Sequence, residues 1–189
     1  MVMDGEKLRN GIFALRTRRF GSVAECMVKR LLNCSQARSL FHDLYDDAKN
    51  HRIEVKFSVV QKKSEQTVTE KTVLRCIEEA TAENRMVAFP CWQQNEFDCN
   101  IQQVKRAEFD VLYYGLFFSD CVKIFRIESG SIKENTRGGR IYYSDFQHKG
   151  NEGEGQFHID PNTFQIHLDH YHYKSLTYDE LYQLLATES

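Results

Sequence analysis

Hydrophobic and polar positions along the chain follow a helical period in three segments, residues 21–33, 69–83 and 175–185. Ser22 with Glu25 and Thr177 with Glu180 form the S/T-x-x-E pattern of a capping box at the start of the first and last segments. Thr69 is a candidate N-cap for the middle segment. The pattern therefore predicts three helices.

Strand patterns occupy the stretches between these helices, at residues 39–45, 52–60, 86–92, 109–118 and 121–127. The first two stretches are joined by a polar turn and predict a hairpin. The last two are continuous apolar runs separated by Ser119 and Asp120, which is typical of a hairpin of buried central strands. A glycine-rich stretch, residues 148–159, must begin as a loop and precedes one further strand. The order of elements predicts an α/β (α+β) fold with a central mixed sheet flanked by helices.

Length and composition limit the class of protein. A chain of 189 residues and 22.2 kDa, 41% hydrophobic, is large enough for one well-buried core, and we expect a single domain over residues 1–189. No run approaches the roughly 18 apolar residues that span a bilayer, and the first residues lack an apolar signal region. We therefore expect a cytoplasmic protein with no membrane partner.

Charge patterning draws attention to the predicted strand 52–60. Its apolar positions alternate with a side that begins with Glu54 and Lys56, about 6.6 Å apart at ~3.3 Å per residue. The preceding turn would bring Asp43 beside them. Converging carboxylates suit a hard cation such as Mg²⁺, and a neighbouring ammonium can lower the pKa of a metal-bound water or stabilise developing phosphoryl charge. These residues are candidates for a phosphodiesterase site.

The spacing of these residues resembles a known signature. Asp43, then ten residues, then Glu54-Val55-Lys56 is similar to the D…(D/E)xK motif of the restriction-endonuclease-like nuclease superfamily. The resemblance implies that Asp43 and Glu54 bind the metal and that Lys56 activates or orients the attacking water. Glu25 lies where many members carry a glutamate on the preceding helix, and it would support the metal site. His42 stands in place of the family's frequent proline, which leaves Asp46 and Asp47 as alternatives to Asp43.

Within the superfamily the chain most resembles a small type II restriction endonuclease. That resemblance implies Mg²⁺-dependent hydrolysis of double-stranded DNA at a short specific sequence by a homodimer. It also implies a cognate DNA methyltransferase in the same restriction system. The catalytic core would cover about residues 20–130, and a DNA-contacting loop about residues 133–160.

Candidate DNA contacts are the basic and amide side chains near these regions. Lysine and arginine suit phosphates or guanine edges, and asparagine and glutamine suit adenine edges. The candidates are Arg16, Arg18, Arg19, Arg137, Arg140, His148, Lys149, Asn151 and Gln156. The formal net charge of −2 does not oppose this, because cations neutralise the carboxylates of a metal-dependent nuclease in use.

Other interpretations of the same residues remain open. Glu25 has a complete structural explanation in the capping box, and Glu54 with Lys56 would also suit the solvated face of an edge strand. A non-catalytic nucleic-acid- or protein-binding domain, or a structure-selective repair nuclease, are alternatives at the level of function. His170 and His172 share one face of the predicted final strand and His167 the other, so we expect no zinc site there.

Overall fold

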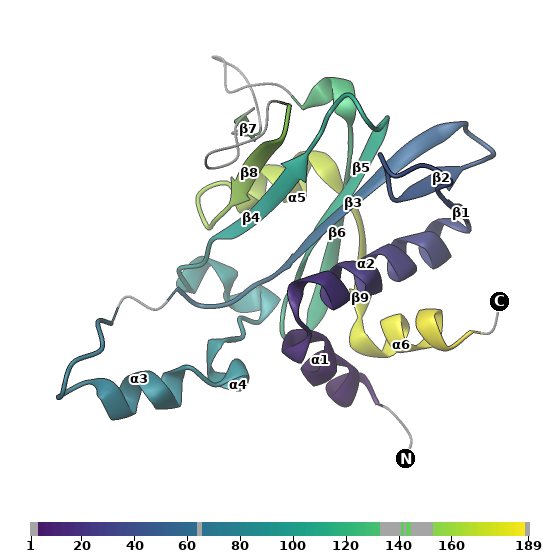
Figure 1. The fold of residues 1–189 in the computed structure, drawn as a ribbon. Helices are drawn as coiled ribbons and strands as arrows, with labels where there is room; N and C mark the ends of the chain where they lie inside the picture. Colours follow the sequence, from purple (N-terminus) through teal and green to yellow (C-terminus); the bar gives the residue numbers. More distant parts are fainter. Residues whose placement is uncertain (1–3, 64–65, 133–140, 142, 145–152, 188–189) are drawn as a thin grey trace.

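A six-stranded mixed sheet forms the centre of the computed structural model, which describes residues 4–63, 66–132, 141, 143–144 and 153–187 (Figure 1). The strand order is β1-β2-β3-β5-β6-β9. The strands are β1 (Ser35–Gln36), β2 (Leu44–Asp46), β3 (His51–Val59), β5 (Val111–Phe117), β6 (Cys121–Glu128) and β9 (His172–Thr177). β3 and β5 are parallel, and the other neighbouring pairs are antiparallel.

A second, three-stranded sheet and several helices surround the main sheet. The small sheet has the order β4-β8-β7. Its strands are β4 (Cys99–Val104), β7 (Tyr143–Ser144) and β8 (Gly155–Ile159). The helices are α1 (Gly5–Ala14), α2 (Thr17–Leu32), α3 (Val73–Glu79), α4 (Ala82–Arg85), α5 (Phe164–Tyr171), α6 (Tyr178–Ala186) and the 3₁₀ turns η1 (Phe89–Gln94) and η2 (Ser129–Ser131). The expected α/β class, with a mixed sheet flanked by helices, is confirmed.

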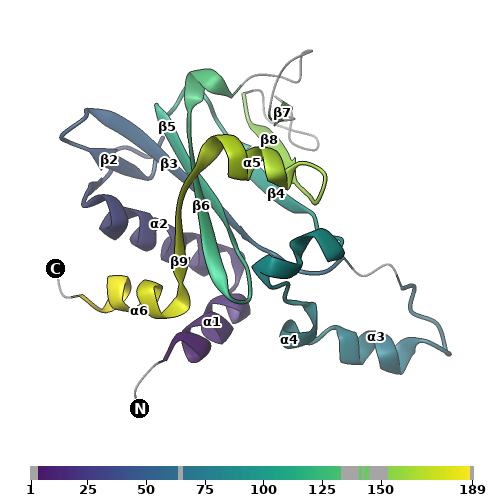
Figure 2. The same cartoon turned by 180° about the vertical axis from the view of Figure 1, so that it is seen from behind.

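The two faces of the main sheet bury two separate apolar cores. On one face α1, α2 and α6 pack against β3, β5 and β6, through side chains such as Met27, Leu181 and Val55. On the other face lie the small sheet and α5 (Figure 2). Every residue of β5 is buried, because this central strand is covered on both faces. The buried hairpin predicted from the two continuous apolar runs is confirmed.

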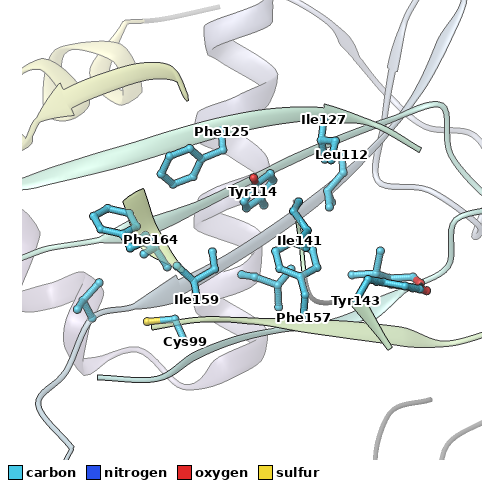
Figure 3. Packing of buried hydrophobic residues seen from close by; sticks show 14 of the residues in the cluster. Cys99, Leu112, Tyr114, Phe125, Ile127, Ile141, Tyr143, Phe157, Ile159 and Phe164 are labelled. Carbon is cyan, nitrogen blue, oxygen red and sulfur yellow. The ribbon is translucent and has the colours of Figure 1, made fainter. Parts of the chain in front are cut away.

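The second core is strongly aromatic. Figure 3 shows rings and branched side chains of the main sheet facing those of the small sheet and α5. Tyr114 and Phe125 stack with ring centroids 5.2 Å apart, and Phe157 meets Tyr114 edge-on at 5.3 Å. Packed rings of this kind hold the small sheet against the main sheet, and the apolar area they bury is the main source of their stabilisation.

Several predicted elements differ from the structure. The strand expected over 39–45 is reduced to β2, because residues 37–43 form a connecting segment. The strand expected over 86–92 is replaced by η1, where Pro90 at the first turn favours a helical start, and an isolated bridge joins Met86 to Gln61. Residues 167 and 170 lie on α5 rather than on a strand.

The middle helix differs most from its prediction. Residues 69–83 contain the short helix α3 and the start of α4, and none of the residues of these two helices is buried. α3 extends away from the body of the protein in both views, and Leu74 and Ile77 are 79% and 63% exposed (Figures 1 and 2). Thr72, rather than Thr69, precedes α3. The apolar periodicity is real, but no described part of the chain covers it.

The two predicted capping boxes have opposite outcomes. At α6, Thr177 and Glu180 form the complete reciprocal box. At α2 the prediction is wrong, because the helix begins one turn earlier, at Thr17, and Ser22 lies inside it with its hydroxyl donating to the Arg18 carbonyl. Among the described residues, no helix is long and apolar enough to cross a membrane.

Candidate active site

The short length of β2 determines where the Asp43 carboxylate lies. The β2–β3 pairing ends at Leu44 and Ile53, and Asp43 continues it by donating its backbone N–H to the Ile53 carbonyl at 3.0 Å. The next N–H on this edge of β3, that of Val55, donates instead to Oδ2 of Asp43 at 2.9 Å. A carboxylate therefore stands at the uncovered edge of β3, beside its charged residues.

Glu54 and Lys56 meet on one face of β3, as the alternation predicted. The Lys56 ammonium donates to Oε1 of Glu54, and it lies 3.8 Å from Oδ2 of Asp43. Neither residue is a solvated edge charge, since the side chains of Glu54 and Lys56 are only 11% and 22% exposed. Parallel pairing with β5 covers the other side of this part of β3, with Glu54 opposite Leu112.

Burial has a large effect on the ionisation of Glu54. Loss of solvation raises the pKa of this carboxyl from 4.5 to about 7, against the opposing effect of the Lys56 ammonium, and Asp43 adds to the increase. Without a further cation, Glu54 therefore carries a full negative charge only above neutral pH. A buried carboxyl whose pKa is so far from its usual range, next to a second acid and a lysine, is typical of a functional site.

Glu25 belongs to the same cluster through electrostatics rather than through a hydrogen bond. It projects from the second half of α2, and its pKa is raised first by burial and then by the negative charge of Asp43, while Lys56 lowers it. Because Ser22 is not an N-cap, the capping function that competed for Glu25 does not exist. The structure thus brings Glu25, Asp43, Glu54 and Lys56 together from three elements.

One acidic residue near the cluster was missed in the sequence. The negative charge of Glu108, which precedes β5, contributes to the raised pKa of Glu54. Glu108 pairs with Lys105 at 3.8 Å, and Lys105 also pairs with Glu154 at 3.3 Å. The only local signal was an acid placed directly before an apolar run, which is a common pattern at strand starts.

The neighbouring aspartates are engaged elsewhere. The Asp46 carboxylate accepts from the backbone N–H groups of Ala48 and Lys49, both at 3.1 Å, and therefore stabilises the β2–β3 turn. Asp47 accepts the hydroxyl of Ser35 at 2.8 Å. The geometry favours Asp43 over either of them as the partner of Glu54.

The donor set suits a hard divalent cation. Asp43 and Glu54 offer carboxylate oxygens beside a common cation, the Lys56 ammonium, so the site already stabilises positive charge between them. In the described ranges, no three His, Cys, Asp or Glu side chains converge as a ready-made metal cluster. Mg²⁺ does not require one, because it commonly binds through one or two carboxylates and retains several waters. The residues therefore fit such an ion.

The predicted DNA contacts are only partly within the described residues. Arg16, Arg18 and Arg19 are exposed at the start of α2. Gln156 lies on β8, where its side-chain oxygen accepts from the Asn100 amide at 3.0 Å, so its main contact is within the small sheet. The remaining candidates lie outside the described residues: Arg137, Arg140, His148, Lys149 and Asn151.

Comparisons with known proteins add no relative. No family model matches the chain, and neither the curated proteins nor the solved structures contain a match.

Proposed function

We propose that this protein is a Mg²⁺-dependent DNA endonuclease of the restriction-endonuclease-like type, most similar to a type II restriction enzyme. The observation that carries the proposal is the convergence of Asp43, Glu54 and Lys56 at the uncovered edge of β3. The D…(D/E)xK spacing of these residues in the sequence supports the same function. We place the enzyme in the cytoplasm, acting on double-stranded DNA as a homodimer, with a cognate methyltransferase as its partner activity.

Each residue of the candidate site has a role that follows from the chemistry of its side chain. Asp43 and Glu54 would hold the metal ion, and Glu25 would support it from α2 through a water or a second ion. A bound Mg²⁺ supplies an activated water and Lewis-acid stabilisation of the phosphoryl oxygens. Lys56, which lies beside both carboxylates, would orient the attacking water or stabilise charge on the phosphate. The site around Glu54 is poorly solvated, as the burial of this side chain shows, and low solvation strengthens each of these electrostatic interactions.

Cleavage of unmethylated plasmid DNA tests this function. The purified protein with Mg²⁺ should produce discrete fragments, and sequencing the fragment ends would reveal a shared target. Glu54→Ala and Lys56→Ala should each reduce cleavage by about 10³-fold or more, because both remove charge that the transition state needs. Glu25→Gln should slow cleavage by about 10- to 100-fold, since its contact with the site is indirect.

The matched control is Glu128→Gln, which neutralises an exposed glutamate at the end of β6. This variant should cut like the wild type. Cleavage by the wild type that persists in EDTA, or that survives Lys56→Ala, would contradict the proposal. Discrete nicking of branched DNA without cleavage of plasmid would favour a structure-selective nuclease instead.

A further inference from the structure

The segment between β1 and β2, residues 37–43, exposes two adjacent apolar side chains next to the candidate site. Leu40 is 104% exposed and Phe41 is 64% exposed. Single exposed apolar residues are ordinary on protein surfaces. Here, however, two of them stand side by side, and Phe41 is only two residues from Asp43.

A cavity of about 660 Å³ lies against the same segment. Its walls include Gln36, Arg38, Ser39, His42, Tyr45 and Asp47. The volume falls in the range of small-molecule sites, roughly 300–1,000 Å³. Its lining mixes apolar surface with groups able to donate and to accept hydrogen bonds, so the cavity suits a ligand that has both apolar and polar parts.

Two groups in this cavity lack partners within the described part of the chain. Nδ1 of His42 is buried and forms no hydrogen bond. Arg38 is exposed and makes no ion pair with a described residue. A buried polar atom without a partner costs free energy of about 1–3 kcal/mol. The cavity therefore offers the Arg38 cation to a ligand, and the His42 ring in its wall has a buried nitrogen without a partner.

The segment is tied to the backbone of Asp43. The Gln36 side-chain amide and the Ala37 N–H both donate to the Asp43 carbonyl, at 2.8 and 3.2 Å. Within the segment, the Phe41 N–H donates to the Ser39 hydroxyl at 3.1 Å. These bonds close the segment onto the residue that would hold the metal. A ligand in the cavity is thereby positioned relative to the cleavage site.

We propose that this segment and cavity form the subsite for the DNA nucleotide next to the scissile phosphate. The Phe41 ring and the Leu40 side chain pack against a base, as aromatic and apolar side chains do when they stack on or wedge between bases. Arg38 binds a backbone phosphate, and Gln36 meets polar atoms of the nucleotide. The inference rests on the proposed function, because it takes the bond cleaved at Asp43 and Glu54 to be a DNA phosphodiester.

DNA binding without cleavage tests the subsite. Short fluorescein-labelled duplexes of mixed sequence are titrated by anisotropy, at one fixed salt concentration, with Lys56→Ala protein and with the same protein carrying Phe41→Ala or Leu40→Ala. Loss of the stacking side chain should weaken binding by about 5- to 100-fold. The control substitutions are Leu74→Ala and Ile77→Ala, which remove equally exposed apolar side chains on the distant α3 and should leave the affinity unchanged.

Turnover by the otherwise wild-type protein gives the second measurement. Phe41→Ala and Arg38→Ala should raise KM for plasmid cleavage by a similar factor and leave kcat within about twofold, because they bind substrate without touching the reacting atoms. Unchanged affinity and KM would overturn the subsite, as would dissociation of a dimer by Phe41→Ala with DNA affinity unchanged, which would make the segment a protein interface. If DNA binding depends on Phe41 but the wild type never cuts DNA, the segment is a DNA-binding site and the proposed nuclease function is wrong.

Discussion

Apart from tyrosine, tryptophan and cysteine, Glu54 and His167 are the two buried polar side chains of the described residues, and their surroundings are opposite in kind. Glu54 lies on β3, and His167 packs from α5 against β5 and β6. Both have a pKa strongly shifted by loss of solvation. They differ in what surrounds them, and that difference separates a structural polar group from a functional one.

His167 is a neutral core residue with a hydrogen-bond partner in the core. Its Nδ1 lies 2.8 Å from the Tyr114 hydroxyl, and its ring stacks on Phe157 at an interplanar angle of 15°. Burial lowers the pKa of His167 to about 4, so the imidazole carries no charge at neutral pH. The rings of Tyr114, Phe125 and Phe157 surround this uncharged imidazole. The pair is a component of the aromatic core.

Glu54, by contrast, has no hydrogen-bond partner of its own among the described residues. Its hydrogen-bond partner Lys56 is shared with Asp43, and two further acids, Glu25 and Glu108, act on the same group of charges. Like charges held together in a poorly solvated place are costly unless a cation joins them. A shifted pKa is therefore common to both residues. What distinguishes the candidate site is a group of acids with only one lysine between them.

Glu54→Gln gives the largest expected effect that could break this comparison. Glutamine keeps the shape and removes the charge, so cleavage should fall by about 10³-fold or more. At pH 8 the same substitution should raise the free energy of unfolding by about 1–3 kcal/mol, because the wild type must hold an ionised carboxylate in a buried position. Plasmid cleavage and thermal unfolding at pH 8 measure the two effects. A variant that loses activity and stability together would mean that Glu54 is a structural residue.

Tyr114→Phe should lower the stability of the fold without changing cleavage, which is the reverse of the result expected for Glu54→Gln, and its effect should be smaller. It leaves the buried His167 without its partner, and unfolding should become easier by about 1–3 kcal/mol. Cleavage per folded molecule should not change. Urea unfolding at pH 7 provides the measurement, with Tyr173→Phe, a tyrosine that is 44% exposed, as the control. A loss of activity greater than the loss of folded protein would connect this pair to the active site.

The pH dependence of stability should show the smallest effect, with opposite signs at the two residues. The pKa of Glu54 is raised to about 7 from 4.5, so its stabilising contribution is complete below pH 4.5 and is lost as the pH rises through 7. The pKa of His167 is lowered to about 4 from 6.5, so its contribution is complete above pH 6.5 and is lost as the pH falls through 4. Between pH 4.5 and 6.5 the two slopes oppose one another.

Single substitutions should uncover these slopes, each less than about 1.4 kcal/mol per pH unit. Between pH 5 and 6.5, Glu54→Gln should make stability rise more steeply with pH than in the wild type, and His167→Phe should make it rise less steeply or fall. Thermal unfolding across this range, in one buffer system, provides the measurement. Parallel curves for the three proteins would show that the two groups are not shifted in the folded state.

Local sequence patterns predicted correctly the elements whose apolar runs can be buried in only one way. The continuous apolar runs of β5 and β6 require cover on both faces, and they form the centre of the sheet. The same reasoning failed for residues 69–83, where a helical apolar stripe is left exposed on α3. Ser22 and Glu25 have the spacing of a capping box, yet α2 begins earlier because Phe20 is also buried against the sheet. Helix starts depend on which residues find a surface to pack on.

The sequence by itself determined the alternation of apolar and polar residues along β3, the residue types of the candidate site and the number of residues between Asp43 and Glu54. Only the tertiary structure decided that Asp43 rather than Asp46 or Asp47 meets Lys56, that Glu25 belongs to the cluster, and that Glu108 contributes from the segment before β5. The physical reason is that spacing along a strand is a local property, set by backbone geometry. The burial that raises the pKa of Glu54 arises from segments far apart in the chain, since β5 pairs along the other side of β3.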